Sequence, residues 1–181
     1  METGGERYGS ESPGTVTPDG VDLIARADRR LGFIDLTDYL ETSLSRAGIW
    51  DGACVAFCRH TTCALVINEW EDGALEDLRD RIRWLFPPDD YYAHDDHTRR
   101  TQNLMPAERR NGHAHVAAML MGGTSLAIPV RRGRLVLGRW QRVILVELDH
   151  PKDRSVALQF LPSAVRAHPM RRSENISARA S

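Results

Sequence analysis

The stretch from Ala53 to Glu69, A-C-V-A-F-C-R-H-T-T-C-A-L-V-I-N-E, decides how the rest of the chain folds. Two apolar runs rich in Val, Ile, Phe and Cys, each as long as a typical strand, enclose the polar insert Arg59-His60-Thr61-Thr62. We expect two strands that hold His60 in a fixed place, where solvent and ligands can still reach it. The alternative interpretation is a plain strand–turn–strand unit whose Thr and Asn side chains bind backbone groups.

Strand patterns occur on both sides of this stretch. On the amino-terminal side, alternating apolar residues predict one strand at 21–27 and a second at 31–36. On the carboxyl-terminal side, apolar runs predict strands at 125–130, 135–137, 143–147 and 155–161. No internal repeat relates these segments.

Three helices are predicted between the strands. Leucines on one stripe predict a helix capped by Thr37 or Asp38 and ended by Gly48. A second stripe predicts a helix that ends before Pro87. The third helix is expected to follow Asn111, which is a plausible cap.

Composition divides the chain into one domain and two tails. The 181 residues are enough for a single domain with a substantial core. The first 20 residues are rich in Gly, Ser, Thr, Pro and Glu, and the last segment is rich in Arg, Ser and Ala, so neither can bury much apolar surface. We therefore predict a disordered tail at 1–20, one domain at 21–162 and a second tail at 163–181.

Charge and cysteine content argue against several classes of protein. The formal net charge of −1 provides no basic field for nucleic acid or an anionic membrane surface. No apolar stretch is long enough to span a bilayer. The cysteines Cys54, Cys58 and Cys63 match no zinc or iron–sulfur spacing. Without a secretory leader, we expect them to be reduced, buried residues of a cytoplasmic protein.

Polar residues that could form a site stand at element ends or in the segment from Asp89 to Gly112, which is long for a loop in a compact domain. Imidazoles and carboxylates that converge can bind a divalent metal or act as general acid and base. No pair has the spacing of a local metal motif, so spacing alone cannot show convergence. The candidates are His60, Asn68, Glu69, Asp77, His94, Asp95, Asn111, His115, Gln141 and Glu147.

Several motifs occur in a fixed order along the chain. They are His60-Thr61-Thr62, Asn68-Glu69, His94-Asp95, Asn111-Gly-His-Ala-His115, Ile128-Pro129-Val130, Gly133-Arg-Leu135-Val-Leu-Gly138-Arg-Trp140-Gln141 and Glu147-Leu-Asp149. Together they make the chain similar to the YjbQ-like family, also called the secondary thiamine-phosphate synthase family, over about Val21 to Leu161. Two departures stand out: Arg139 replaces a usual Thr, and the segment from Asp96 to Arg110 is longer than its counterpart.

The resemblance implies an α+β fold, a β-sandwich of mixed or antiparallel sheets flanked by helices. It implies a homotrimer in which the polar residues gather near a subunit interface. It also implies a weak thiamine-phosphate synthase activity, a transferase reaction that joins hydroxymethylpyrimidine diphosphate to a thiazole phosphate and releases pyrophosphate. Such a reaction requires orientation of two substrates and charge stabilisation of the leaving group.

Under this interpretation each candidate residue receives a role. The catalytic residues would be His60, His94, His115 and Glu69. A small phosphorylated or heterocyclic substrate would contact Thr61, Thr62, Asn68, Asn111, Arg139 and Gln141. A divalent metal, Mg²⁺ or Zn²⁺, would be held by Asp77, Asp95 and Glu147, with Glu69 as a further candidate ligand.

Two other hypotheses stay open on the sequence. The chain could be a non-catalytic trimeric module that binds a metal or metabolite through the same histidines. Alternatively, the polar residues could satisfy one another across a wet trimer interface. A shared site requires the rings of His60, His94 and His115 to face one cavity, within one subunit or across two.

Overall fold

The computed structural model describes residues 21–163. Its helices are α1 (Thr37–Ala47), α2 (Asp72–Leu85), α3 (Gly112–Leu120) and the short 3-10 helix η1 (Ala93–Asp95). Its strands are β1 (Val21–Ala25), β2 (Phe33–Asp35), β3 (Gly52–Cys58), β4 (Cys63–Glu69), β5 (Ser125–Arg131), β6 (Arg134–Leu135), β7 (Gln141–Glu147) and β8 (Arg154–Pro162). The predicted tails lie outside the described residues, apart from Ser163.

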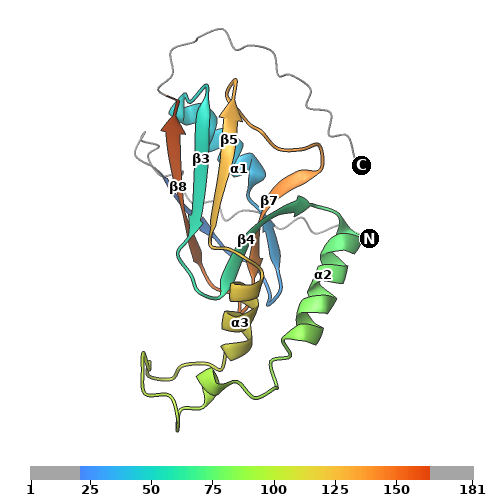
Figure 1. The fold of residues 1–181 in the computed structure, drawn as a ribbon, viewed down its shortest axis with the longest axis vertical. Coiled ribbons are helices and arrows are strands. Elements are labelled where there is room, and N and C mark those ends of the chain that lie inside the picture. The colour runs from blue at the N-terminus through green and yellow to red at the C-terminus, as the bar shows by residue number, and fades with distance from the viewer. Residues whose placement is uncertain (1–20, 164–181) are drawn as a thin grey trace, which may run out of the picture.

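The strands form two antiparallel sheets. The first has five strands in the order β1-β8-β3-β5-β6, and the second has three in the order β2-β7-β4. Every pairing within them is antiparallel. Figure 1 shows the larger sheet in the upper part of the molecule and α3 at its lower end. The chain is therefore a mixed α+β protein, as predicted.

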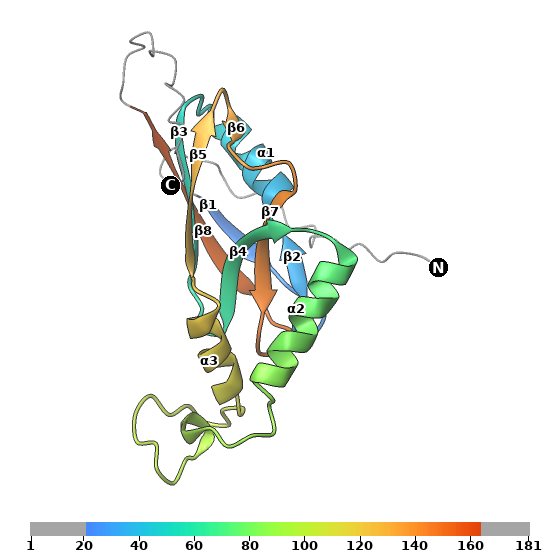
Figure 2. The same ribbon diagram turned by 45° about the vertical axis from the view of Figure 1, so that its right-hand side comes forward.

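The three-stranded sheet is buried on both faces. Leu65 and Leu145, which lie opposite each other on β4 and β7, face the core that also contains the larger sheet and α1. Their neighbours Ala64 and Val146, also opposite each other, face a second core against α2 and α3. Successive residues of a strand point to opposite faces, so the near-continuous apolar run of β7 serves both cores. Figure 2 shows α2 and α3 beside this sheet.

The predicted side-chain caps of α1 and α3 do not form, although Asn111 does stand at the N-cap position of α3, and other carboxylates take their place. At the start of α1, the Oδ1 atom of Asp35 accepts a hydrogen bond of 2.9 Å from the Thr37 backbone N–H. At the start of α3, the Asn111 side chain makes no cap bond, and Asp95 from the distant η1 binds the backbone instead. A carboxylate satisfies free N–H groups and the positive end of a helix wherever it comes from.

The Cys54, Cys58 and Cys63 side chains are buried free thiols, as predicted. Burial raises the pKa of Cys54 to about 12. A hydrogen bond between Cys58 and Cys63 lowers the pKa of Cys58 to about 7 and raises the pKa of Cys63. These two thiols flank the Arg59–Thr62 turn, but at 1% and 0% exposure they are closed to ligands.

The pairing of β4 with β7 sets where the polar residues lie. Its register runs from Cys63 opposite Glu147 to Glu69 opposite Gln141. With a rise of about 3.3 Å per residue, these two ends are about 20 Å apart. The motifs at the start of β4 are thus separated within one chain from those at its end.

Glu147 and Arg154 form an ion pair inside the protein. Glu147 is 0% exposed and Arg154 is 1% exposed. The Nε atom of Arg154 donates to Oε2 of Glu147 at 2.6 Å, and Nη2 donates to Oε1. The Asp149 backbone N–H also donates to Oε1, at 2.9 Å. The bidentate pair joins β7 of the smaller sheet to β8 of the larger one.

No helix within residues 21–163 is long and apolar enough to cross a membrane.

Replacing Glu147 by Ala should strongly destabilise the fold, because Arg154 would be left buried and unpaired. We expect a loss of about 3–5 kcal/mol in the free energy of unfolding, measured by urea titration. Replacing both residues by Met should recover most of that loss, since no buried charge remains.

The matched control is the exposed pair of Arg26 with Asp153, whose side chains are 60% and 67% exposed. Asp153→Ala should cost less than about 1 kcal/mol. Equal losses from Glu147→Ala and Asp153→Ala would show that the buried pair does not hold the sheets together.

Candidate functional site

Two predicted site residues, His94 and His115, lie ring against ring. Their centroids are 4.4 Å apart and the ring planes are inclined by 50°. His94 comes from η1 and His115 from the first turns of α3. Burial, and next the neighbouring His94, lower the pKa of His115. A neutral His115 imidazole at physiological pH can accept a proton.

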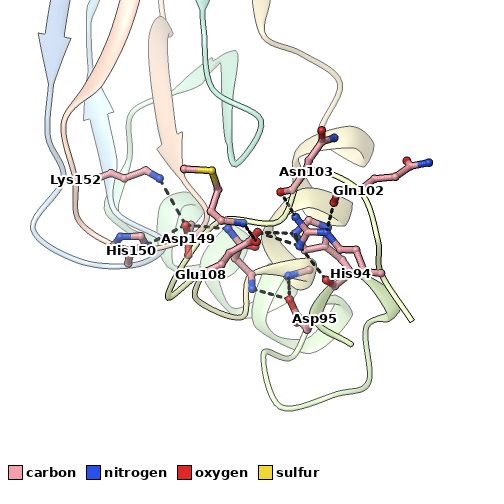
Figure 3. A network of polar contacts seen from close by, with 12 residues as sticks. His94, Asp95, Gln102, Asn103, Glu108, Asp149, His150 and Lys152 are labelled. Atoms are coloured by element: carbon pink, nitrogen blue, oxygen red, sulfur yellow. Dashed lines mark hydrogen bonds and ion pairs between the residues drawn. The ribbon is translucent and has the colours of Figure 1, made fainter. Parts of the chain in front are cut away.

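The segment after η1 folds back so that Arg100 and Glu108 lie beside His94. Nη1 of Arg100 lies 3.2 Å from Nε2 of His94 and donates to Oε1 of Glu108 at 3.0 Å. Oε1 of Glu108 lies 3.6 Å from Nε2 of His94. Figure 3 shows these contacts around His94 and Glu108. The long polar segment thus has an ordered interior with Arg100 at its centre.

Asp95 joins the same network to the start of α3. Its Oδ1 atom accepts hydrogen bonds from the backbone N–H groups of Asn111 at 2.9 Å and Gly112 at 3.0 Å. A Cβ atom on Gly112 would lie 2.4 Å from Cβ of Tyr92, so only glycine allows this close approach. Asp95 therefore sets the position of α3, and with it the position of His115.

Asp149 forms the inner end of the network. Its side chain is 5% exposed, and Oδ2 accepts a hydrogen bond of 3.4 Å from Nδ2 of Asn111. Nδ1 of His150 lies 2.9 Å from the same oxygen, outside hydrogen-bond geometry, and Nζ of Lys152 lies 4.0 Å from it. Figure 3 shows Asp149 between these side chains and Glu108. Asp149 does not line the cavity beside His115, so it contacts this region through Asn111.

His115 opens onto a cavity of about 430 Å³. The other residues that line it are Thr61, Ala118, Met119, Gly122, Gly123 and Thr124. The lining is largely apolar, with one imidazole and two hydroxyl groups. Thr61 comes from the turn between β3 and β4, so the turn that begins the central motif reaches this cavity.

His60 binds the backbone of β8 and does not line the cavity beside His115. Its Nε2 atom accepts a hydrogen bond of 2.8 Å from the backbone N–H of Ser155. Burial, and next the Arg154 guanidinium, lower the pKa of His60. Thr62 is buried beside it, and its carbonyl accepts from the Leu148 backbone N–H at 3.2 Å. In one subunit, His60 therefore secures the turn against β8.

A second group of predicted residues lies at the other end of β4 and β7. Asn68 binds its neighbour, the Glu69 backbone N–H, at 2.9 Å, and Gln141 accepts from the Gly138 N–H at 2.7 Å. The Arg139 guanidinium lies 4.8 Å from the centroid of the Trp140 ring. A cavity of about 420 Å³ here is lined by Asp35, Glu69, Trp70, Glu71, Arg139, Trp140 and Arg142.

The three predicted metal ligands lie in different surroundings. Asp77 is exposed on α2, Asp95 caps α3, and Glu147 is paired with Arg154. Across residues 21–163, no three His, Cys, Asp or Glu side chains are arranged to hold a metal ion. Binding of a divalent metal stays a prediction.

Sequence reasoning missed Arg100, Glu108, Asp149 and His113 as members of this region. Asp149 was visible as the last residue of the Glu147-Leu-Asp149 motif, but its contact with Asn111 depends on the fold. Arg100 and Glu108 had no periodic pattern around them to indicate a role. His113 is 5% exposed, and neither of its ring nitrogens has a hydrogen-bond partner.

The fold and the polar network define a mixed α+β protein with two antiparallel sheets and a paired-imidazole region. A family model described as UPF0047 protein YjbQ-like matches residues 22–163. The chain therefore belongs to the UPF0047, YjbQ-like family.

Related proteins and solved structures share this fold. A UPF0047 protein from Archaeoglobus fulgidus is 36% identical over 141 residues, which cover 78% of this chain and 100% of the relative. A structure from Aeropyrum pernix has 35% identity and a TM-score of 0.69, and covers 80% of this chain and 99% of its own. One from Sulfolobus solfataricus, described as a YbjQ-like protein of unknown function, has 32% identity and the same TM-score of 0.69. It covers 80% of this chain and 96% of its own.

These comparisons contradict the thiamine-phosphate synthase activity that the resemblance implied. The relatives from Archaeoglobus fulgidus and Bacillus subtilis bear only UPF0047 family names, which specify no reaction. The matching family model likewise names no synthase or transferase. The synthase activity was expected because one name of the family refers to it. The motifs in the sequence identify the family but no reaction.

The buried His113 should make folding stability depend on pH. Burial, and next the Arg30 guanidinium, lower the pKa of His113, although the carboxylates of Asp149, Asp95 and Asp89 oppose this. Below about pH 6.5, the unfolded chain therefore binds more protons than the folded protein, so stability falls as pH falls. His113→Phe should lose less stability than the wild type between about pH 8 and about pH 5.5.

Urea unfolding at both pH values measures this difference. His97, which is exposed, provides the control, and His97→Phe should keep the wild-type dependence on pH. A His113→Phe protein that loses as much stability as the wild type would exclude a protonation penalty at His113.

Proposed function

We propose that the protein binds a small, neutral heterocyclic ligand in the cavity beside His115, where the paired imidazoles support proton transfer. The observation that carries this proposal is the position of His115. Its ring lies against that of His94, and the same residue lines the cavity of about 430 Å³. Small-molecule sites usually combine an apolar wall with a few polar groups that orient the ligand.

The lining supports a heterocycle over a phosphorylated compound. None of the seven residues around this cavity is Asp, Glu, Lys or Arg. A phosphate would need cationic or several backbone donors, whereas a flat ring can pack on Met119 and exchange a hydrogen bond with His115. Thr61 and Thr124 add hydroxyl groups that can donate or accept.

We further propose the homotrimer that the resemblance implies. The helix α3 packs inward through Ala114 and Ala117, yet its outer residues Met119 and Leu120 are 83% and 70% exposed. A helix that is apolar on all sides is normally covered on all sides, and a neighbouring copy would cover this face. The core shared by the two sheets supports the β-sandwich arrangement.

Replacing His115 by Ala should weaken ligand binding by about tenfold, which corresponds to the loss of one hydrogen bond, or about 1.4 kcal/mol. The probes are pyridine, pyrimidine and indole, with phenyl phosphate as the anionic comparison. Chemical-shift changes in NMR titrations give the affinities.

His97→Ala provides the matched control, because this imidazole is exposed and does not line the cavity. It should leave the affinities unchanged. The proposal is wrong if a folded His115→Ala protein binds the heterocycles as tightly as the wild type, or if phenyl phosphate binds best.

The wild-type protein should sediment with about three times the chain mass of 20.4 kDa. Leu120→Asp should lower that mass, because it places a charge in the proposed interface. Leu85→Asp on α2, where the residue is 56% exposed, is the control and should sediment like the wild type. A monomeric wild type at micromolar concentration would overturn the trimer.

A further inference from the structure

All three guanidinium nitrogens of Arg100 donate hydrogen bonds within the segment from His94 to Glu108. Nε donates to the Gln102 carbonyl at 3.0 Å, and Nη2 donates to the Asn103 carbonyl at 2.7 Å. Nη1 donates to the His94 carbonyl at 3.1 Å and to Oε1 of Glu108 at 3.0 Å. Its side chain is only 12% exposed. These four acceptors, on four residues, hold the planar guanidinium group in one orientation.

The same Nη1 atom lies 3.2 Å from Nε2 of His94. Nη1 carries two hydrogens for three acceptors, namely the His94 carbonyl, Oε1 of Glu108 and Nε2 of His94, so one hydrogen is shared between two of them. Because a guanidinium group only donates hydrogen bonds, Nε2 of His94 must accept. A proton on Nε2 would place two donors against each other at this distance. The neutral ring must therefore carry its proton on Nδ1.

Glu108 is the group that would favour a proton on Nε2 of His94. Its Oε1 atom is 3.6 Å from Nε2 of His94, which is longer than a hydrogen bond. Oε1 is 3.0 Å from Nη1 of Arg100, and Oε2 accepts from the Met105 backbone N–H at 3.3 Å. Both carboxylate oxygens of Glu108 thus accept hydrogen bonds from other donors. The contact with Arg100 therefore determines whether Nε2 of His94 carries a proton.

His115 differs from His94 in this respect. Within residues 21–163, neither ring nitrogen of His115 has a hydrogen bond, and His115 is one of the residues that line the cavity. The two imidazoles are therefore not equivalent. Arg100 donates to the unprotonated nitrogen of His94, whereas His115 is free to accept a proton.

The geometry points to Arg100 as a positioning residue that fixes the His94 proton on Nδ1 and thereby makes His115 the imidazole that exchanges a proton with the ligand. This assignment deepens the proposed function and rests on it for the ligand alone. The arrangement of protons on His94 is a property of the free protein.

Ring-nitrogen NMR of protein labelled with ¹⁵N-histidine tests the assignment without any ligand. The wild type should show an unprotonated Nε2 and a protonated Nδ1 on His94. In Arg100→Met, which keeps the bulk but removes every donor, the proton should move to Nε2, where Glu108 can accept it. Arg100→Lys retains a cationic donor and should keep the wild-type pattern.

Arg99→Met is the matched control, because Arg99 is exposed and donates instead to the Tyr91 hydroxyl. It should leave the His94 signals unchanged. A protonated Nε2 on His94 in the wild type would overturn the assignment, and so would an unchanged His94 in folded Arg100→Met.

Addition of the pyridine or pyrimidine probe separates this inference from the proposed function. The inference predicts that the His115 nitrogen signals shift while Nε2 of His94 stays unprotonated. Failure of both probes to bind, with the His94 pattern intact, would refute the proposed ligand and leave the role of Arg100 in place. A ligand-induced proton on Nε2 of His94 would refute the division of roles.

Discussion

The antiparallel register between β4 and β7 is the constraint on which the rest of the structure depends. It places Glu147 beside the Arg59–Thr62 turn and Gln141 beside Glu69, at opposite ends of the smaller sheet. Because both faces of this sheet are buried, a slip of one residue would move every core side chain to the wrong face. The buried pair of Glu147 and Arg154 then links this end of the smaller sheet to β8 of the larger one.

The histidine region depends on this frame and on a segment with little regular structure. Two contacts hold the residues between α2 and α3. Asp95 binds the start of α3, and Arg100 binds carbonyl groups of the same segment, including that of His94. No residue from 88 to 111 is buried, so polar contacts rather than apolar packing hold this segment. The longer segment, noted as a departure from the family pattern, supplies both Arg100 and Glu108.

The sequence predicted most of the elements but not how they meet. The spacing of apolar residues and the positions of glycines were enough to predict α1, β3, β4 and the burial of the cysteines. These features depend on residues that are close together in the chain. Strand pairing, the cap from Asp95 and the contact of His94 with His115 join residues far apart in the chain, and no local pattern records them. The family resemblance was confirmed, while the reaction attached to it was contradicted, because a shared fold and motif set do not determine chemistry.

The most direct test of the account is whether His94 and His115 lie against each other in solution. A nuclear Overhauser experiment on protein with ¹³C-labelled histidine rings measures this without a ligand or a variant. With ring centroids 4.4 Å apart, the account predicts a cross-peak between the two rings. If both rings are assigned in the folded protein and no cross-peak appears, the central claim is contradicted.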